Sequence, residues 1–131
     1  MHCQLRTQQG LAFDGEAQMV VARSPNGAFA VMDGHAPLFA RLEAAPLRIK
    51  TADKKEHTFA VTAGILRVSE NGVTILAQKA IPAQEIKLAS VQDRMEKIKQ
   101  EIQSANEEDR ERLEKELTEL RTQTRAKKGN V

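Results

Sequence analysis

The sequence predicts an α+β fold in which a small all-β part is followed by an antiparallel pair of helices. Six of the seven glycines and all four prolines lie in residues 1–88, whereas residues 89–128 contain neither. Turn-forming residues recur about every ten positions in the first part, and apolar residues recur at helical spacing in the second. The clearest change in composition therefore falls near residue 88.

Short strands joined by tight turns are predicted for the first part. Turn signals occur at Asp14-Gly15, Pro25-Asn26-Gly27, Asp33-Gly34, Ala45-Pro46, Asp53-Lys54-Lys55 and Asn71-Gly72. This rhythm is typical of a β-sandwich or barrel. Residues 19–21, 61–68 and 73–76 are rich in Val and Ile, which suit a pleated surface. Asn71-Gly72 is the strongest hairpin signal, because both residue types tolerate the positive φ of a type I′ turn.

Two helices are predicted for the second part. The first has an apolar stripe at intervals of three and four, through Leu88, Val91, Met95, Ile98, Ile102 and Ala105. The second begins after Asn106, a good N-cap residue, with acidic residues in its first turn, where the helix dipole favours negative charge. A short connection between two amphipathic helices predicts an antiparallel hairpin.

The second helix has a small apolar seam, formed by Leu113, Leu117 and Leu120 and fading at Thr124. Burying one such side chain contributes roughly 1.5–3 kcal/mol. Ordering the backbone costs on the order of 1–2 kcal/mol for each residue. We therefore expect residues 107–128 to be only marginally held and able to detach.

Composition argues against several classes of protein. The formal net charge is +2, and the chain has four Phe but neither Trp nor Tyr, which disfavours a nucleic-acid binder. The single cysteine, Cys3, cannot form an internal disulfide. The start of the chain is too polar for a signal peptide, and no apolar run approaches the roughly 18 residues that span a bilayer. Any membrane contact is therefore expected only through a partner.

The residues give no support for an enzyme, a metal site or a cofactor. His2, His35 and His57 are far apart and lack neighbouring ligands at metal-binding spacing. Neither a Gly-x-Ser-x-Gly motif nor a phosphate-binding loop is present. The acidic residues alternate with basic ones along the helices, as on a solvated face.

Residues 26–38 are the remaining candidate for function. A short strand from Ala28 to Met32 runs between two turns, Gly34 can supply positive φ, and Pro37 lacks a backbone donor. The residues alone favour an ordinary β-turn, with His35 making a local hydrogen bond, over a functional loop.

At these residues the chain resembles the epsilon subunit of the F-type ATP synthase, whose mitochondrial counterpart is named delta. Residues 26–38 are similar to the family's Gly-Glu-x-Gly-Ile-x-Pro-Gly-His-Ala-Pro-Leu segment. Residues 47–49 with 59–68 resemble its Val-x-Ser-Gly-Gly-Phe-Leu-Glu-Val strand, and residues 71–77 resemble its Asn-x-Val-Thr-Val-Leu-Ala strand. The order and spacing hold over about residues 4–86.

This resemblance implies a β-sandwich of about ten strands over residues 1–86 and a regulatory helical hairpin over residues 87–131. It implies a central-stalk rotor subunit, itself not catalytic, at the cytoplasmic face of a bacterial membrane. The expected partners are the gamma subunit, the c-ring and the alpha and beta subunits, and no nucleic acid. By position, the residues expected to meet the c-ring and gamma are Asn26, Gly27, Ala28, Met32, Gly34, His35, Ala36, Pro37 and Leu38.

The chain departs from the family in two places. Ala28 stands where many relatives carry Glu, and Asp33 stands where Pro is usual. Many bacterial members bind ATP through Ile/Leu-Asp-x-x-Arg-Ala at the start of the helices. Of this motif the chain keeps only Ile86, with Lys87, Ser90 and Val91 at the other three positions. We therefore predict that it does not bind ATP in the usual way.

The hairpin of bacterial members can extend along gamma and block ATP hydrolysis, which implies the same role here. The basic residues expected to contact the catalytic subunits in that state are Arg110, Arg112, Lys115, Arg121, Arg125, Lys127 and Lys128. A solvated helix whose charges complement its dipole is the simpler interpretation, and the two are compatible. An adaptor with a β-domain head and a coiled coil would explain the two-part layout, but not the three matching stretches.

Overall fold

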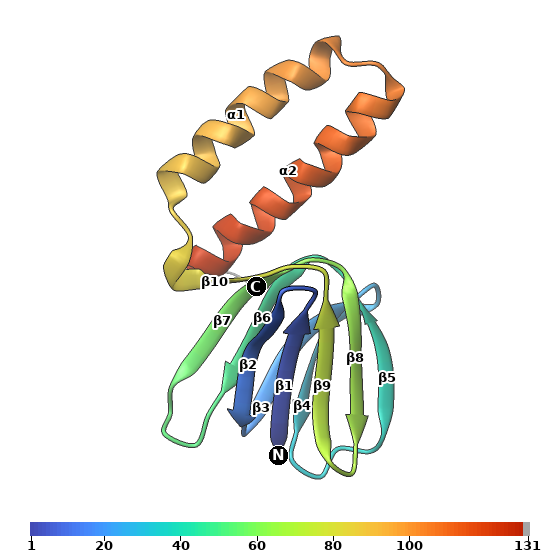
Figure 1. Ribbon diagram of the computed structural model, residues 1–131, viewed down its shortest axis with the longest axis vertical. Helices are drawn as coiled ribbons and strands as arrows, with labels where there is room; N and C mark the ends of the chain where they lie inside the picture. Colours follow the sequence, from blue (N-terminus) through green and yellow to red (C-terminus); the bar gives the residue numbers. More distant parts are fainter. Residues whose placement is uncertain (130–131) are drawn as a thin grey trace.

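The computed structural model describes residues 1–129 and confirms the α+β prediction, with ten strands followed by two helices (Figure 1). The strands are β1 (His2–Thr7), β2 (Gly10–Glu16), β3 (Met19–Ser24), β4 (Gly27–Met32), β5 (Leu38–Leu42), β6 (Ala45–Lys50), β7 (Glu56–Val61), β8 (Gly64–Ser69), β9 (Gly72–Ala77) and β10 (Ala80–Pro82). A 3₁₀ turn, η1 (Ala83–Glu85), leads to α1 (Leu88–Ser104) and α2 (Glu107–Lys128).

The strands form two five-stranded sheets packed face to face, so the β part is a sandwich. The first sheet has the order β2-β1-β9-β8-β5 and the second sheet has the order β10-β7-β6-β3-β4. Within both sheets all neighbours are antiparallel except β1 and β9, which are parallel. The strands β4 and β5, consecutive in the chain, therefore lie at the edges of different sheets.

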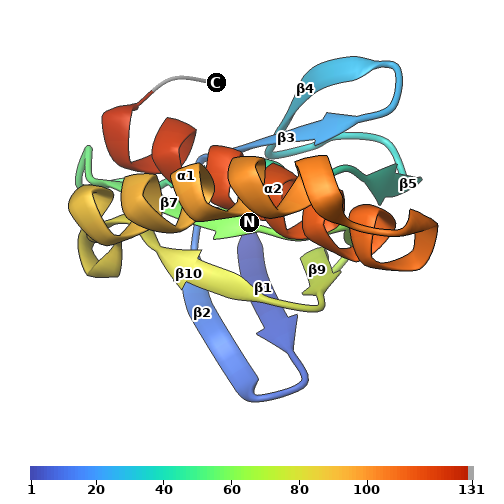
Figure 2. The same ribbon diagram turned by 90° about the horizontal axis from the view of Figure 1, so that it is seen from above.

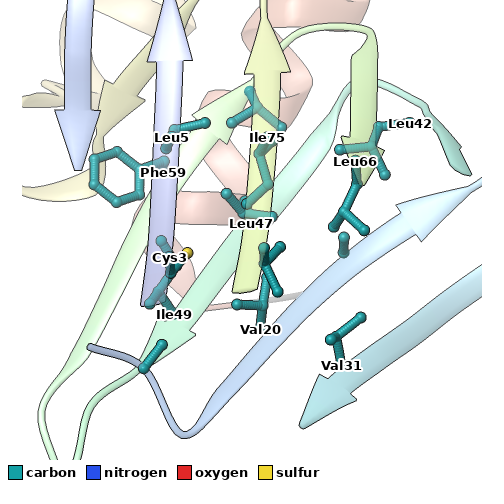
Figure 3. Packing of buried hydrophobic residues seen from close by; sticks show 14 of the residues in the cluster. Cys3, Leu5, Val20, Val31, Leu42, Leu47, Ile49, Phe59, Leu66 and Ile75 are labelled. Atoms are coloured by element: carbon teal, nitrogen blue, oxygen red, sulfur yellow. The ribbon is translucent and has the colours of Figure 1, made fainter. Parts of the chain in front are cut away.

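The core lies between the sheets, where alternate residues of each strand point inward (Figure 3). Leu5, Leu47, Leu66 and Ile75 are fully buried there. Cys3 is also buried, and burial raises the pKa of its thiol to about 12. A thiol that stays protonated is a poor nucleophile, so Cys3 serves packing.

The β8–β9 hairpin forms at the predicted place, but the predicted type I′ turn is wrong. Ser69 pairs with Gly72, so the central residues are Glu70 and Asn71, and only Gly72 has positive φ, at 126°. A Cβ atom at position 72 would lie 2.1 Å from the carbonyl oxygen of His2. Glycine is therefore required where the chain leaves the turn and passes β1.

Two other predicted turns, at Asp14-Gly15 and Ala45-Pro46, lie inside strands β2 and β6. Pro46 pairs with Ala60 on β7, while β3 pairs only with the Arg48–Lys50 end of β6. The missing N–H of Pro46 therefore removes no hydrogen bond to β3.

The hairpin lies across one end of the sandwich, with α2 between α1 and the strands (Figures 1 and 2). The predicted cap is confirmed, because the Asn106 side chain accepts a 2.8 Å hydrogen bond from the Asp109 N–H. The buried face of α2 continues beyond the predicted seam to Thr122 and Ala126. These helices share a second buried cluster with Ala60 of β7 and Ile86.

Candidate partner interface

The predicted partner residues follow the open edge of the sandwich between β4 and β5. A groove of about 720 Å³ runs along this edge. Of the predicted residues, Asn26, Gly27, Ala28, His35 and Leu38 line it. Edge strands carry unpaired backbone groups, which gives such a groove hydrogen-bonding capacity as well as apolar surface.

The loop from Met32 to Leu38 lies at the far end of β4, away from the helices. Met32, Gly34 and His35 surround a smaller hollow of about 260 Å³ together with Met1 and the Glu70–Asn71 turn. The N-terminus marks this end of the sandwich, opposite the hairpin (Figure 1). Ala36 and Pro37, between the groove and the hollow, are exposed. Seven of the nine predicted residues thus line two hollows that share His35, and Ala36 and Pro37 line neither.

Local hydrogen bonds shape this loop. The His35 N–H donates to the Met32 carbonyl at 3.1 Å and closes the turn, in which Gly34 has a φ of 83°. The Nδ1 of His35 lies 2.6 Å from the Ala36 carbonyl oxygen. Because a carbonyl can only accept, Nδ1 carries the hydrogen in this contact. The expected local hydrogen bond of His35 is therefore present.

A second surface, missed from the sequence, covers the outer face of the first sheet. The register aligns one row of outward residues across all five strands: Leu11, Arg6, Leu76, Ile65 and Arg41. The next row contains Gln4, Thr74, Arg67 and Phe39. Four large apolar side chains stand exposed in the described residues, and three of them, Leu11, Phe39 and Leu76, are on this face.

Arginines interrupt the apolar residues of this face. Arg6, Arg41 and Arg67 are exposed, and none makes an ion pair within residues 1–129. The other two arginines of the sandwich, Arg23 and Arg48, pair with Glu43 and Glu56. We use the name arginine face for the five residues of the first row together with two residues of the next row. Its members are Leu11, Arg6, Leu76, Ile65, Arg41, Arg67 and Phe39.

The sequence contains one signal for this face, namely pairs of adjacent apolar residues within its strands. Successive side chains of a strand point to opposite faces, so two adjacent apolar residues place one of them outward. Such pairs occur at Leu38-Phe39, Ile65-Leu66 and Ile75-Leu76, on three neighbouring strands. The signal identifies an apolar outer face, but only the register shows that the three pairs share it.

The four positions of the ATP-binding motif lie where α1 begins. Ile86 and Val91 are buried in the cluster between the helices, and Lys87 and Ser90 are exposed. Lys87 occupies the N-cap position without a side-chain hydrogen bond, and the first turn of α1 has no acidic residue. A cation is unfavourable at this end of a helix dipole. The start of α1 therefore lacks the stabilising features found in α2.

Ion pairs connect the hairpin internally and to the sandwich. The Arg94 guanidinium donates two hydrogen bonds to the Glu116 carboxylate, at 2.9 and 3.2 Å, which joins α1 to α2. This bidentate contact lowers the pKa of Glu116, with the hydrogen bond from Arg94 as the main cause. Lys79 lies 3.8 Å from Glu119 and links the β9–β10 connection to α2.

The basic residues predicted to contact catalytic subunits all lie on α2. Six of them, Arg110, Arg112, Lys115, Arg121, Lys127 and Lys128, are exposed, and Arg125 is half-buried. Arg112 pairs with Asp109 at 3.3 Å, and Arg112 and Lys115 line a hollow beside Lys79. In this folded hairpin the basic residues do not form one compact patch.

Among residues 1–129, no three His, Cys, Asp or Glu side chains are arranged to hold a metal ion. Neither α1 nor α2 is long and apolar enough to cross a membrane.

Comparison with known proteins decides the family. The sequence model described as "ATP synthase, Delta/Epsilon chain, beta-sandwich domain" matches residues 1–83. This chain belongs to the ATP synthase delta/epsilon family. An ATP synthase epsilon chain of Rubrobacter xylanophilus is 32% identical over 111 residues, which are 85% of this chain and 75% of that one.

Other epsilon chains match over different lengths. That of Bordetella avium is 32% identical over 127 residues, covering 96% of this chain and 90% of that one, and so includes the hairpin. That of Brevibacillus brevis is 40% identical over 80 residues, or 61% of each chain.

The fold also matches chains in solved structures of mitochondrial ATP synthases. A chain of the Euglena gracilis mitochondrial ATP synthase superimposes with a TM-score of 0.85 at 22% identity, over 95% of this chain and 79% of that one. A chain from the central stalk and c-ring of the Tetrahymena thermophila enzyme gives a TM-score of 0.63 at 13% identity, over 97% of this chain and 96% of that one. At these identities the likeness concerns the fold.

Proposed function

We propose that this chain is a non-catalytic rotor subunit of the central stalk of an ATP synthase. In this role it connects the ion-driven c-ring to the gamma subunit, and rotation passes through it to the catalytic head during ATP synthesis. It works at the cytoplasmic face of a bacterial membrane, peripherally, through its complex.

The observation that carries this proposal is the position of the predicted contact residues in a chain of this family. The Met32–Leu38 loop is at the end of the sandwich opposite the hairpin, and the groove beside it is open. A contact at that end leaves the hairpin free to face the other way. We assign this loop, and with it the Asn26–Ala28 turn at the other end of β4, to the c-ring and gamma.

Co-purification tests the assembly. Tagged full-length chain, expressed in its own host, is expected to bring down gamma, alpha, beta and the c-ring. A charge and shape change in the loop, His35→Glu with Pro37→Ala, is expected to lower the yield of the c-ring while the free chain keeps its melting temperature. The matched control is Asp53→Ala, a substitution in the exposed β6–β7 turn. Recovery of the chain without any of these subunits would refute the proposal.

The hairpin is proposed to inhibit ATP hydrolysis by leaving the sandwich and reaching the catalytic subunits. The limited apolar burial between α2 and the strands supports such a movement, since Ala60 is the one buried strand residue in the helical cluster and Ile81 of β10 packs against it only partly buried. The movement then brings the basic residues of α2, most of which are already exposed, to acidic surfaces of alpha and beta. Removal of residues 89–131 is expected to raise hydrolysis by the assembled enzyme, and unchanged hydrolysis would contradict the inhibitory role.

We also propose that the hairpin is not controlled by ATP binding in the usual way. Lys87 and Ser90 stand at the positions of the motif Asp and Arg, and both are exposed without hydrogen bonds that would arrange a nucleotide site. Calorimetry with Mg-free ATP is expected to show no binding to the full chain. Micromolar affinity would overturn this part of the proposal.

A further inference from the structure

The helix α2 has two packed sides that differ in chemistry. One side faces α1, and the other faces β6 and β7 (Figures 1 and 2). The helix α1 contributes four large apolar side chains to the helical cluster, namely Val91, Met95, Ile98 and Ile102. The strands contribute the small Ala60 and, partly buried, Ile81. Apolar burial therefore joins α2 mainly to α1.

Polar contacts are divided in the same way. The Arg94 guanidinium on α1 donates hydrogen bonds of 2.9 and 3.2 Å to the Glu116 carboxylate on α2. Among residues 1–129, no hydrogen bond joins α2 to a strand, and the one ion pair between α2 and the sandwich is the 3.8 Å contact of Lys79 with Glu119. The Lys79 side chain is 65% exposed, so solvent screens this pair.

The buried polar residues between α2 and the strands form their hydrogen bonds on their own side. Thr62 and Thr122 are both buried and line a hollow of about 70 Å³. The Thr62 hydroxyl accepts a 2.9 Å hydrogen bond from the Lys79 N–H, within the sandwich. The Thr122 hydroxyl donates a 3.0 Å hydrogen bond to the Thr118 carbonyl, within α2. Separating α2 from the strands therefore leaves neither hydroxyl without its partner, which would otherwise cost stability.

The 3₁₀ turn η1 is suited to act as a hinge. It has no buried residue, and a 3.1 Å hydrogen bond from the Ile86 N–H to the Ala83 carbonyl closes it. Ile86 is buried in the helical cluster, so it moves with the helices. The turn between α1 and α2 lies away from the strands (Figure 1). Hinges are commonly a few residues at the end of an element, and bending at η1 would carry both helices together.

We infer that the hairpin leaves the sandwich as one unit, with α1 and α2 still packed together, by opening the contact of α2 with β6 and β7 and bending at η1. This rests on the proposed function in one respect, namely that the detached hairpin is the form that acts on the catalytic subunits. The inference adds which side of α2 opens. The alternative is that the two helices separate from each other and extend singly.

Thiol labelling of the free full chain tests which side of α2 opens. Thr122→Cys places a thiol of similar size against the strands, and Ile98→Cys places one between the helices. The exposed variants Thr118→Cys and Lys99→Cys give the unprotected rates on each helix. Burial raises the pKa of the Cys3 thiol to about 12, so it reacts slowly, and the unmodified chain supplies the background.

Relative to its exposed control, the thiol of Thr122→Cys is expected to react at least about tenfold faster than that of Ile98→Cys, because only the first becomes accessible when an intact hairpin detaches. The shorter side chain of Ile98→Cys loosens the contact between the helices, which works against this expectation. Equal protection of the two thiols, or greater protection of Thr122→Cys, would overturn the inference.

A disulfide between the helices separates this inference from the proposed function. The Thr124 hydroxyl lies 3.8 Å from the Met95 sulfur, so Met95→Cys with Thr124→Cys can join α1 to α2. Oxidation, verified by mass spectrometry, is expected to leave the inhibition of ATP hydrolysis in the assembled enzyme unchanged. If oxidation instead raises hydrolysis to the level reached without residues 89–131, the inference is overturned and the inhibitory role stands. If removal of residues 89–131 does not raise hydrolysis, the inhibitory role fails and labelling of the free chain decides the inference.

Discussion

The molecule has two hydrophobic cores that differ in size and origin. The sandwich core joins sixteen buried residues from both sheets and brings distant parts of the chain together. The helical core joins eight, seven of which come from the segment after β10. The difference indicates that the sandwich can remain folded when the hairpin leaves it, because local stability follows local burial.

The largest expected effect is in the sandwich core. Ile75 is fully buried in the central strand β9, so Ile75→Ala is expected to lower the free energy of unfolding by about 2–5 kcal/mol. Urea unfolding followed by circular dichroism measures this change. A loss below about 1 kcal/mol would mean that the core collapses around the cavity and is less well packed than the burial indicates.

A substitution in the helical core tests whether the two cores are independent. Leu117 is 7% exposed in α2, and Leu117→Ala is expected to cost about 2–3 kcal/mol, expressed as faster hydrogen exchange in both helices. Amides of the sandwich strands should keep their protection. The matched control is Thr118→Ala, at the exposed neighbouring position. Equal loss of protection in the strands would show that the cores unfold as one unit.

The start of α2 offers a smaller and more local test. Asn106→Ala removes the side-chain acceptor for the Asp109 N–H and is expected to cost about 1 kcal/mol. Exchange should rise in the first turn of α2. The substitution Asn106→Asp keeps an acceptor at the cap and is expected to restore protection.

The smallest effect concerns pH. The Arg94 hydrogen bond lowers the pKa of Glu116 in the folded chain below its ordinary value of 4.5. Stability from this pair is therefore present above that value and is lost as the pH falls through the folded pKa. Solvent screens the pair, because Glu116 is 38% exposed. Hydrogen exchange of the helix amides is expected to increase slightly at acidic pH, and Glu116→Gln is expected to remove this increase. If the pH profile of exchange is unchanged in the variant, the increase is due to other carboxylates.

Much of the fold could be predicted because it depends on local patterns. Composition located the change from strands to helices, and Asn106 located the start of α2. The β8–β9 turn type was wrong because Gly72 is required by the passage of β1, which is distant in sequence. The turn predicted at Ala45-Pro46 was wrong for a similar reason. A proline is tolerated within β6 because β3 pairs only with the other end of that strand, and the sequence does not show where this pairing stops.

The candidate site also has one part that local sequence predicts and one part that it does not. The loop around His35 could be found because its residues are contiguous and resemble a known segment. The arginine face could not, because its residues come from all five strands of one sheet and only the pairing register aligns them. The composition of a sheet face is a property of tertiary structure, and periodicity in a single strand gives only the contribution of that strand.

The order of the helices has a consequence for synthesis. The strands leave the ribosome first, α1 follows, and α2, which packs between α1 and the sandwich, is made after both. Domains generally fold as they emerge, so the sandwich can be complete while α1 still lacks its packing partner. Until α2 has emerged, no helix covers the apolar residues of α1, among them Val91 and Ile98. The arrival of α2 ends this period of exposure.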